Sequence, residues 1–446
     1  MTAVRVVVIG AGIVGAACAL EALRDGHHVT LLDPAPPGGE QAASYGNGCW
    51  LSTSSVVPMT APGLWRRVPA WLADPLGPLA IRPSYLPRAL PWLWRFLRAG
   101  ATEARVHAIG AALRPLLVDA PSRHLALATQ AGVAHLIRRD GLLYVFPSRQ
   151  DFLAERLAWE VRRAQGVRWI ELDADALRQS EPALDRRYRF GVLVEEGAHC
   201  LDPGGYVAAL VAYAEAQGAR RVTARANGFA RDGRRLRAVR ADGRDIPCDR
   251  AVIAAGAWSK LLARDVGDRI PLETERGYHA TIADPGIALR HAIMPSDAPM
   301  SNTLMNAGLR LAGQVEFAGL RAAPNWRRAA ILRDHALRIY PGLPRDLAAE
   351  RVTFWMGHRP SLPDGLPCIG PARDCPDVIH AFGHGHIGLA SGAITGRLVA
   401  DLLADRPPVI DPAPYLPARF SPAVSAFAHS GRAGDGAGTR VSGNAR

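Results

Sequence analysis

The fold is decided by residues 4–33, which read VRVVVIGAGIVGAACALEALRDGHHVTLLD. The run from Val4 to Ile9 is β-branched apart from Arg5 and is long enough for one buried strand of a parallel sheet. A G-x-G-x-x-G pattern follows, then a helix-forming stretch, then a second apolar strand that ends on Asp33. Because strand, glycine turn, helix, strand and acid all occur in order, this stretch predicts a site for FAD or NAD.

Each part of the pattern has a mechanical role. Gly10 allows the tight turn, Gly12 lets the backbone approach a pyrophosphate, and Gly15 lets the helix pack against the strand. Free N–H groups and the positive dipole at the helix start then hold the phosphates. Asp33 lies 18 residues beyond Gly15, where its carboxylate accepts hydrogen bonds from the ribose hydroxyls and disfavours a 2′-phosphate.

Length and hydropathy describe a two-domain protein. The chain has 446 residues, more than one hydrophobic core usually organises. It has no run of 18 apolar residues, and its apolar start is interpreted as the first strand rather than a signal peptide. We therefore expect a cytoplasmic protein. Its basic charge leaves peripheral contact with the inner face of a membrane open.

Charge and cysteine content exclude several classes of function. The formal net charge is +12, yet Lys260 is the only lysine and the arginines are spread along the chain. Nucleic-acid binding needs basic residues clustered with aromatic ones, so no nucleic-acid partner is expected. The six cysteines form no C-x-x-C pair and no zinc spacing with histidines, so we expect reduced, mostly buried thiols and no metal site.

Two segments follow the second strand. Residues 41–48, QAASYGNG, have small side chains that let backbone N–H groups approach a ligand. Residues 88–98 predict an amphipathic helix with one apolar face, formed by Leu90, Leu93, Trp94 and Leu97. Core packing is the expected role of the tryptophans in this region.

The second half of the chain returns to strands and glycine turns. An apolar strand begins at Ala251 and breaks at Gly256. Short strands between residues 272 and 317 predict an antiparallel sheet that forms one wall of a pocket. Residues 357–370 are expected to form an irregular loop, and residues 378–404 repeat the order strand, glycine turn, helix.

Four segments together resemble the FAD-dependent D-amino-acid oxidase superfamily over about residues 4–410. They are the opening glycine pattern, ASYGNG, AAGAWS, and RPSLPDGLPCIGP followed by GHGHIGLASGAITGRLVADLL. This branch includes bacterial D-amino-acid dehydrogenases, D-hydroxyproline dehydrogenases, glycine oxidase and sarcosine oxidases. The resemblance implies an α/β protein with a Rossmann-like FAD-binding domain and a second α+β substrate domain built on an antiparallel sheet.

The implied domains are discontinuous in the sequence. The FAD-binding domain would comprise residues 1–60, 191–267 and 357–412. The substrate domain would comprise residues 61–190 and 268–356. The remaining residues, 413–446, have no core-forming pattern and are expected to be a disordered tail.

Carried over residue by residue, the resemblance implies a continuous set of FAD contacts. The ADP half would be bound by Gly10, Gly12, Ile13, Val14, Gly15 and Asp33, with Val222 on the adenine side. The pyrophosphate and ribityl chain would lie along Ser44, Asn47, Gly48, Ala255, Gly256 and Trp258. The flavin N1–C2=O edge would face a helix N-terminus, whose dipole stabilises negative charge there, at Gly385, His386, Ile387, Gly388 and Leu389.

The same resemblance implies the substrate contacts. Arg359 matches the arginine that clamps the substrate carboxylate, a role suited to a planar guanidinium. Tyr278 and His279 would lie on the strand that faces the flavin and contact the substrate. His386 stands where glycine oxidase has an arginine, which makes glycine itself a poorer substrate.

The activity implied is oxidative deamination of D-amino acids, D-proline or hydroxy-D-proline included. Hydride would pass from the alpha carbon to flavin N5, and the electrons would pass to a non-oxygen acceptor such as a quinone. Orientation of the substrate would be the main contribution of the protein. The alternatives left open are a sarcosine- or glycine-type oxidase that makes hydrogen peroxide, and a subunit of an oligomer or hetero-oligomer.

Overall fold

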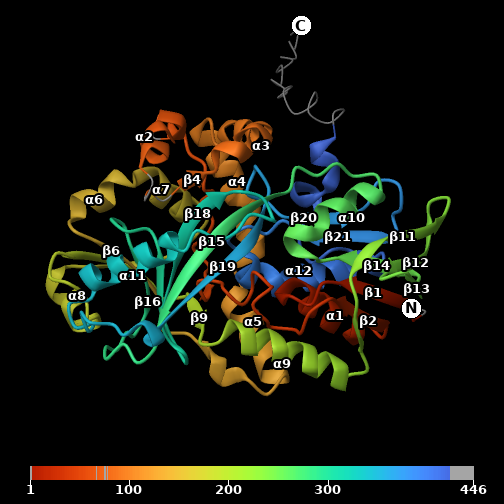
Figure 1. Ribbon diagram of the computed structural model, residues 1–446, viewed down its shortest axis with the longest axis horizontal. Coiled ribbons are helices and arrows are strands. Elements are labelled where there is room, and N and C mark those ends of the chain that lie inside the picture. Colours follow the sequence, from red (N-terminus) through yellow and green to blue (C-terminus); the bar gives the residue numbers. More distant parts are fainter. Residues whose placement is uncertain (1–2, 67, 75–76, 78, 422–446) are drawn as a thin grey trace, which may run out of the picture.

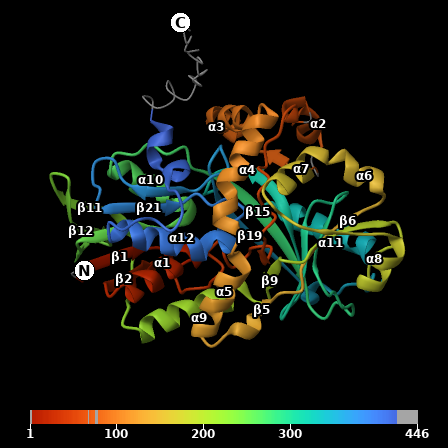
Figure 2. The same cartoon turned by 180° about the vertical axis from the view of Figure 1, so that it is seen from behind.

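Two large sheets lie side by side in the protein, and helices cover their outer faces (Figures 1 and 2). The computed structural model describes residues 3–66, 68–74, 77 and 79–421. No helix in this part of the chain is long and apolar enough to cross a bilayer.

The first sheet has six strands, five of them parallel. Its strand order is β10 (Arg220–Thr223), β2 (His28–Asp33), β1 (Arg5–Ile9), β14 (Arg250–Ile253), β21 (Val378–Phe382) and β20 (Cys368–Pro371). The last strand, β20, runs antiparallel to β21. The predicted Rossmann-like sheet is therefore confirmed, and it recruits strands from both ends of the chain.

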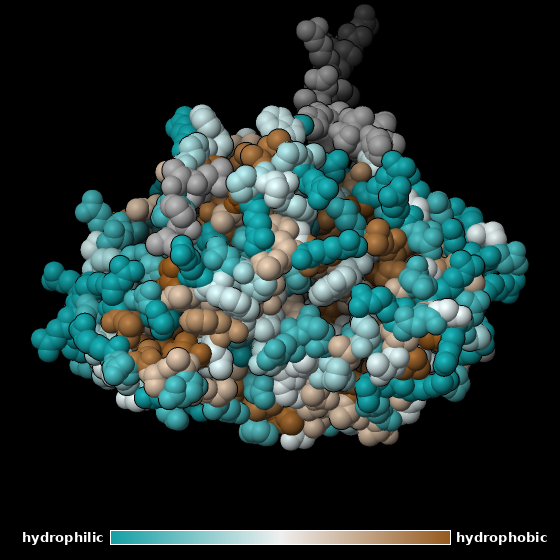
Figure 3. Space-filling view, in the orientation of Figure 1, coloured by the Kyte–Doolittle hydropathy of each residue, from teal (hydrophilic) through white to brown (hydrophobic). Residues whose placement is uncertain are grey.

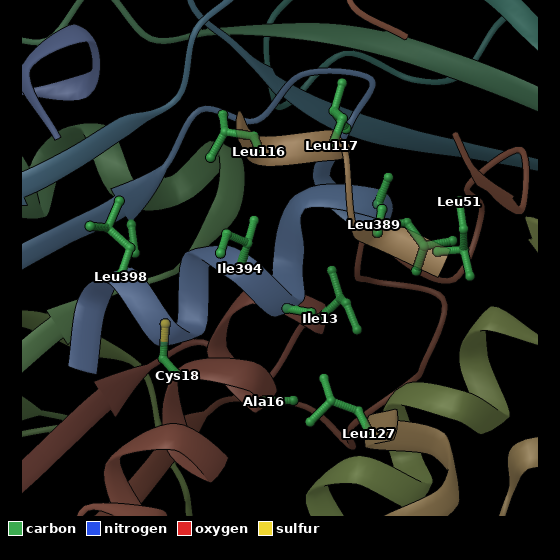
Figure 4. Packing of buried hydrophobic residues seen from close by; sticks show 14 of the residues in the cluster. Ile13, Ala16, Cys18, Leu51, Leu116, Leu117, Leu127, Leu389, Ile394 and Leu398 are labelled. Carbon is green, nitrogen blue, oxygen red and sulfur yellow. The ribbon is translucent and has the colours of Figure 1, made fainter. Parts of the chain in front are cut away.

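Two helices that begin at glycine turns pack closely on this sheet. They are α1 (Ile13–Arg24), which follows β1, and α12 (Gly388–Leu403), which follows β21. A Cβ placed on Gly396 would lie 2.6 Å from the carbonyl carbon of Ala17, and one on Gly392 would lie 2.9 Å from Ile13. Figure 4 shows Ile13 of α1 next to Leu389 and Ile394 of α12 in the apolar core between them.

The second sheet forms the other half of the molecule and is mainly antiparallel. Its strand order is β19 (Val352–Ser361), β15 (Glu273–Ile282), β18 (Gly308–Phe317), β17 (Ser301–Met305), β16 (Ala292–Pro295), β6 (Leu142–Phe146), β8 (Phe190–Val194) and β7 (Ile170–Leu172). A short strand, β4 (Leu79–Ile81), pairs in parallel with β18, and β16 pairs in parallel with β6. Helix α11 (Arg327–Ile339) covers one face of this sheet.

Smaller elements complete the structure. One three-stranded sheet contains β11 (Ala226–Asp232), β12 (Arg235–Ala241) and β13 (Arg244–Pro247), and another contains β3 (Trp50–Leu51), β9 (Ala198–Cys200) and β5 (Ile137–Arg138). The remaining α-helices are α2 (Val68–Ala73), α3 (Leu86–Ala99), α4 (Glu103–Leu117), α5 (Ala120–Gln130), α6 (Arg149–Ala154), α7 (Arg156–Ala164), α8 (Ala174–Ser180), α9 (Pro203–Ala216) and α10 (Ser259–Asp265).

The structure departs from the sequence expectations at three segment boundaries. Strand β8 continues to Val194 and β19 to Ser361, so residues 191–194 and 357–361 belong to the second sheet. The loop expected over 357–370 is therefore wrong for residues 357–361, and also for residues 368–370, which belong to β20. Disorder is also wrong for residues 413–421, because Tyr415 is buried and its hydroxyl donates to the carbonyl of Ala112 at 2.6 Å. Residues 422–446 lie outside the described part.

Helix α3 forms where predicted, but its expected apolar face is mostly exposed. Trp92 is buried, whereas Leu90 is 54% exposed and Trp94 is 63% exposed. Core packing thus explains Trp92, which stacks on Phe96 with ring centroids 5.2 Å apart, and does not explain Trp94. Apolar side chains are visible among hydrophilic ones over α3 in the space-filling view (Figure 3).

The contact between α1 and α12 can be tested through Gly396. The substitution Gly396→Val adds side-chain atoms against the Ala17 backbone, and overpacking of this kind costs about 1–3 kcal/mol. Thermal unfolding followed by circular dichroism should show a Tm lowered by several degrees. Ala111→Val, which also places a valine in a helix but at an exposed position of α4, is the control and should change Tm by much less. Equal shifts in both variants would contradict the close helix contact.

Candidate functional site

A cavity of about 1050 Å³ runs between the two sheets. One side of its lining comes from the carboxyl edge of the six-stranded sheet, where β2, β14 and β21 end and α1 and α12 begin. The other side comes from the face of the nine-stranded sheet, through β19, β15 and β18. The cavity is large enough for a dinucleotide with a small substrate beside it.

The turn between β1 and α1 is built on close backbone contacts. Gly10 has a φ of +106°, and a Cβ there would overlap the carbonyl of Ala254 at the end of β14. A Cβ on Gly15 would overlap the carbonyl of Gly10, so Gly15 has the predicted packing position and does not line the cavity. These contacts bring the start of α1 to the cavity, with first-turn N–H groups that have no partner within the helix.

Gly12 lies on the cavity side of the same turn. Its φ is −73°, which any residue adopts, and an added Cβ would meet only the Ser44 hydroxyl at 3.4 Å. That hydroxyl accepts a hydrogen bond from the backbone N–H of Ile13 at 3.1 Å. The space above Gly12 is therefore kept clear by the missing side chain, and a phosphate fits there.

Asp33 ends β2 at the cavity wall. Its carboxylate accepts hydrogen bonds from the backbone N–H groups of Ala11 at 2.8 Å and Ala35 at 3.0 Å. These two bonds fix the carboxylate and leave acceptor capacity for ribose hydroxyls. The residues thus fit the ADP half of FAD.

The segment 41–48 joins this end of the cavity to the second sheet. Arg310 donates to the carbonyl of Tyr45 at 2.7 Å, and the hydroxyls of Ser301 and Thr303 donate to the carbonyl of Gly48 at 3.2 and 3.1 Å. All three donors lie on β17 or β18. The small-residue segment is therefore anchored to the sheet, and Asn47 and Gly48 line the cavity as predicted from the resemblance.

The turn before α12 lines the cavity at the same edge of the six-stranded sheet as the start of α1. Gly383 and Gly385 have φ values of +87° and +51°, and the N–H of Gly385 donates to the carbonyl of Pro360 on β19 at 2.8 Å. His384 is buried behind the turn and bonds to the Thr395 hydroxyl at 3.1 Å. Burial lowers the pKa of His384 to about 3, so this histidine is neutral and structural.

Three cross-strand pairs of β15 and β19 shape the sheet side of the cavity. They are Glu275 with Arg359, Gly277 with Gly357, and His279 with Trp355. Directly paired residues point to the same face of a sheet. The glycine pair leaves a gap between a charged pair on one side and an aromatic pair on the other.

Arg359 lies across this gap. A Cβ on Gly277 would overlap its guanidinium carbon, and the two terminal nitrogens donate to the carbonyls of Gln314 at 2.9 Å and Gly313 at 3.2 Å on β18. Burial lowers the pKa of Arg359 and the neighbouring charge of Glu275 raises it, and the guanidinium stays cationic. The structure thus places a fixed positive charge in the cavity wall.

Glu275 is the residue at this site that the sequence analysis missed. Its carboxylate lies 2.8 Å from Nε2 of His386, which enters from the turn before α12. Burial raises the pKa of Glu275, but the hydrogen bond and electrostatic attraction of His386, together with the charge of Arg359, outweigh it and hold the pKa below its usual range. The signal for Glu275 was its place two residues before Gly277, on the same strand face.

The structure does not bring Tyr278 to the cavity. Alternation along β15 points its side chain to the opposite face, where it packs under α11 and its hydroxyl donates to Glu316 at 2.6 Å. His279 is also absent from the lining, because it lies beneath Trp355 with ring centroids 5.0 Å apart. Burial and the Arg310 charge lower the pKa of His279 to about 3. Trp355 takes the cavity position expected of His279.

Val222 is a further residue that the structure does not bring to the cavity. It pairs with Leu32 on the neighbouring strand, and residues 225–227 line the cavity in its place. The predicted residues that do line it are Gly10, Gly12, Ile13, Val14, Asp33, Ser44, Asn47, Gly48, Ala255, Gly256, Trp258, Arg359, Gly385, His386, Ile387, Gly388 and Leu389.

Comparison with known proteins identifies the family. Residues 5–402 match the model of the DAO family, FAD dependent oxidoreductase. A protein of Bradyrhizobium diazoefficiens named D-amino-acid oxidase is 57% identical over 416 residues, which cover 93% of this chain and 99% of that protein. A protein of Rhizobium johnstonii named D-amino acid dehydrogenase is 31% identical over 415 residues, which cover 91% and 97%.

Solved structures share the fold at low sequence identity. Glycine oxidase from Geobacillus kaustophilus superposes with a TM-score of 0.66 at 20% identity, covering 93% of this chain and 98% of that one. L-amino acid deaminase from Proteus vulgaris superposes with a TM-score of 0.69 at 16% identity, covering 94% and 98%. These likenesses extend over nearly the whole described chain and include both sheets.

The space above Gly12 gives a test of cofactor binding. Gly12→Val should place a side chain where the phosphate fits and yield a folded protein without FAD, because the backbone angles there suit valine. The measurement is the ratio of flavin absorbance to protein absorbance after purification, with circular dichroism as the check on folding. A folded Gly12→Val protein that kept its full FAD content would remove this turn from the cofactor site.

Proposed function

The chain belongs to the family of FAD-dependent oxidoreductases, and from this premise we propose that it oxidises D-amino acids at the alpha carbon. The observation that carries the proposal is the fixed guanidinium of Arg359 in the cavity wall. The names of the relatives, oxidase and dehydrogenase of D-amino acids, supply the substrate class.

The residues of the cavity each have a part in this reaction. Arg359 binds the substrate carboxylate through a charge-assisted contact. Its hydrogen bonds to the carbonyls of β18 hold the guanidinium in place. The first turn of α12, which lines the cavity, would present its N–H groups to the cofactor ring. FAD, when bound, supplies the two-electron oxidant. Catalysis by the chain itself is then mostly orientation and exclusion of water.

The names of the relatives also bear on the electron acceptor. The relative at 57% identity is named an oxidase, and the one at 31% is named a dehydrogenase. Because the higher identity belongs to the oxidase, we propose oxygen as the acceptor, in place of the non-oxygen acceptor expected from the sequence.

Mixing the purified holoprotein with D- and L-amino acids tests both parts of the proposal. Without oxygen, a D-amino acid should bleach the flavin band and its L-enantiomer should not. In air, hydrogen peroxide should form in step with substrate loss. Bleaching without peroxide would indicate that a quinone or another carrier, not oxygen, accepts the electrons. A flavin band that no amino acid bleaches would overturn the proposed activity.

The role of Arg359 gives a second test. Arg359→Gln removes a charge-assisted contact worth about 3–5 kcal/mol, so kcat/KM should fall by roughly two to four powers of ten while FAD content stays unchanged. Arg333→Gln, which removes a partly exposed arginine of α11 that does not line the cavity, is the matched control and should leave kcat/KM near the wild-type value. Near-normal turnover by Arg359→Gln would place the carboxylate elsewhere.

The exposed side of α3 supports a proposal about location. Leu86, Leu90 and Trp94 are spaced four residues apart and form one exposed apolar line along α3. The same helix contains Arg88, Arg95 and Arg98 and no acidic residue. Apolar side chains flanked by arginines suit the interface of an anionic bilayer. We propose that α3 makes a peripheral contact with such a membrane.

Sedimentation with vesicles tests this contact. The protein should co-sediment with vesicles that contain phosphatidylglycerol and much less with pure phosphatidylcholine. The double variant Leu90→Ser, Trp94→Ser should lose about ten- to a hundredfold in binding, from apolar area no longer buried. Leu153→Ser, which removes an exposed leucine from α6, is the control. Equal sedimentation of all three proteins would contradict the role of α3.

A further inference from the structure

The pair of Glu275 and His386 leaves one imidazole nitrogen open in the cavity. An ionised carboxylate only accepts hydrogen bonds, so the His386 atom 2.8 Å from it, Nε2, carries the proton. The other nitrogen, Nδ1, is then an acceptor in the neutral ring. No hydrogen bond joins Nδ1 to another residue in the described part of the chain, and about a third of the His386 side chain is exposed.

The ionisable groups around this pair are few. Arg359 lies beside Glu275 on β19, with His358 next to it in sequence, and His384 lies in the same turn as His386. Burial lowers the pKa of His358 to about 4 and that of His384 to about 3, so neither histidine carries charge at neutral pH. Among these described residues, the charges near His386 are therefore the carboxylate of Glu275 and the guanidinium of Arg359.

The reaction needs a proton acceptor at this place. A free amino acid carries an ammonium group at neutral pH, and its nitrogen lone pair must be released before the alpha carbon can be oxidised to an imine. The amine sits one carbon from the carboxylate that Arg359 holds. Because Glu275 contacts His386 and pairs with Arg359, a carboxylate bound at Arg359 brings the ammonium group close to the imidazole.

We propose that His386, oriented by Glu275, accepts the ammonium proton of the substrate through Nδ1. The inference rests on the proposed oxidation of amino acids and adds a base to it. In this step an N–H bond of the ammonium breaks, its electron pair stays on the substrate nitrogen, and an Nδ1–H bond forms. The positive charge moves to the imidazolium, whose Nε2–H continues to donate its hydrogen bond to Glu275. Glu275 acts as a positioning residue that fixes the orientation and the tautomer of the ring.

The pH dependence of kcat/KM for a D-amino acid tests the step. In the wild type, kcat/KM should fall at acidic pH, because a base that already carries a proton cannot accept the one from the ammonium group. In His386→Gln this limb should disappear, and kcat/KM at pH 7 should fall by about 10²–10³ and then recover about tenfold per pH unit up to the pKa of the substrate amine. Glu275→Gln keeps the hydrogen bond but removes the charge, so the limb should move to lower pH and the maximum should fall.

A second histidine–carboxylate pair provides the matched control. His291 lies 2.7 Å from Glu181 outside the cavity, so His291→Gln should keep the wild-type pH profile. A His386→Gln enzyme that also kept the wild-type profile would overturn the inference and leave the proposed oxidation intact. A wild type that oxidises no amino acid would instead remove the proposed oxidation itself.

Nitrogen NMR on histidine-labelled protein gives a readout that is independent of turnover. The ligand 2-aminoisobutyrate has an amine and a carboxylate but no hydrogen on its alpha carbon, so it binds without being oxidised. Adding it should shift the Nδ1 signal of His386, assigned by its loss in His386→Gln, because that nitrogen then accepts the ammonium hydrogen bond through which the proton passes. Isobutyrate, which lacks the amine, should not do so. Unchanged His386 signals at saturating 2-aminoisobutyrate would overturn the proposed proton transfer even if the Gln variants misfold.

Discussion

The close contact of α1 with α12 is the constraint on which the rest of the structure depends. Glycines at positions 392 and 396 let α12 approach the first turns of α1 at backbone distance. Both helices follow parallel strands of one sheet, so their N-termini emerge at the same edge. Any larger side chain at this contact would separate the two turns, and the cofactor must be held by both of them at once.

Glycines also determine the chemistry on the facing sheet. Gly277 and Gly357 are directly paired, and the gap that they leave is filled by the guanidinium of Arg359 over Gly277 and by the indole of Trp355 over Gly357. A charge in such a wall is costly unless it is compensated. Here two carbonyls of β18 and the carboxylate of Glu275 compensate it, and Glu275 in turn is satisfied by His386. The three charged or polar side chains therefore form one unit, in which each constrains the next.

Local patterns were sufficient for the cofactor end of the site. Gly10, Gly12 and Asp33 are separated by few residues, and the strand–turn–helix geometry follows from their spacing, so the structure has them where the sequence analysis expected them. The substrate end was harder to predict. Tyr278 and His279 are adjacent on β15, and sequence alone did not tell which faces the cavity; the pairing register turns Tyr278 away and covers His279 with Trp355. The exposure of Trp94 on α3 could not be predicted from the sequence either, because an apolar helix face has the same sequence pattern whether or not another element packs on it.

The sequence by itself determined the dinucleotide turn, the second glycine turn before α12 and the presence of an arginine in a family-like segment, because each is a property of neighbouring residues. The tertiary structure alone decided that Glu275, Arg359 and His386 meet. These residues lie on three elements, and their contact depends on the register of β15 against β19 and on the entry of the α12 turn beside Pro360. Such pairings join residues 84 to 111 positions apart, 275 with 359 and 275 with 386, and no local spacing encodes them.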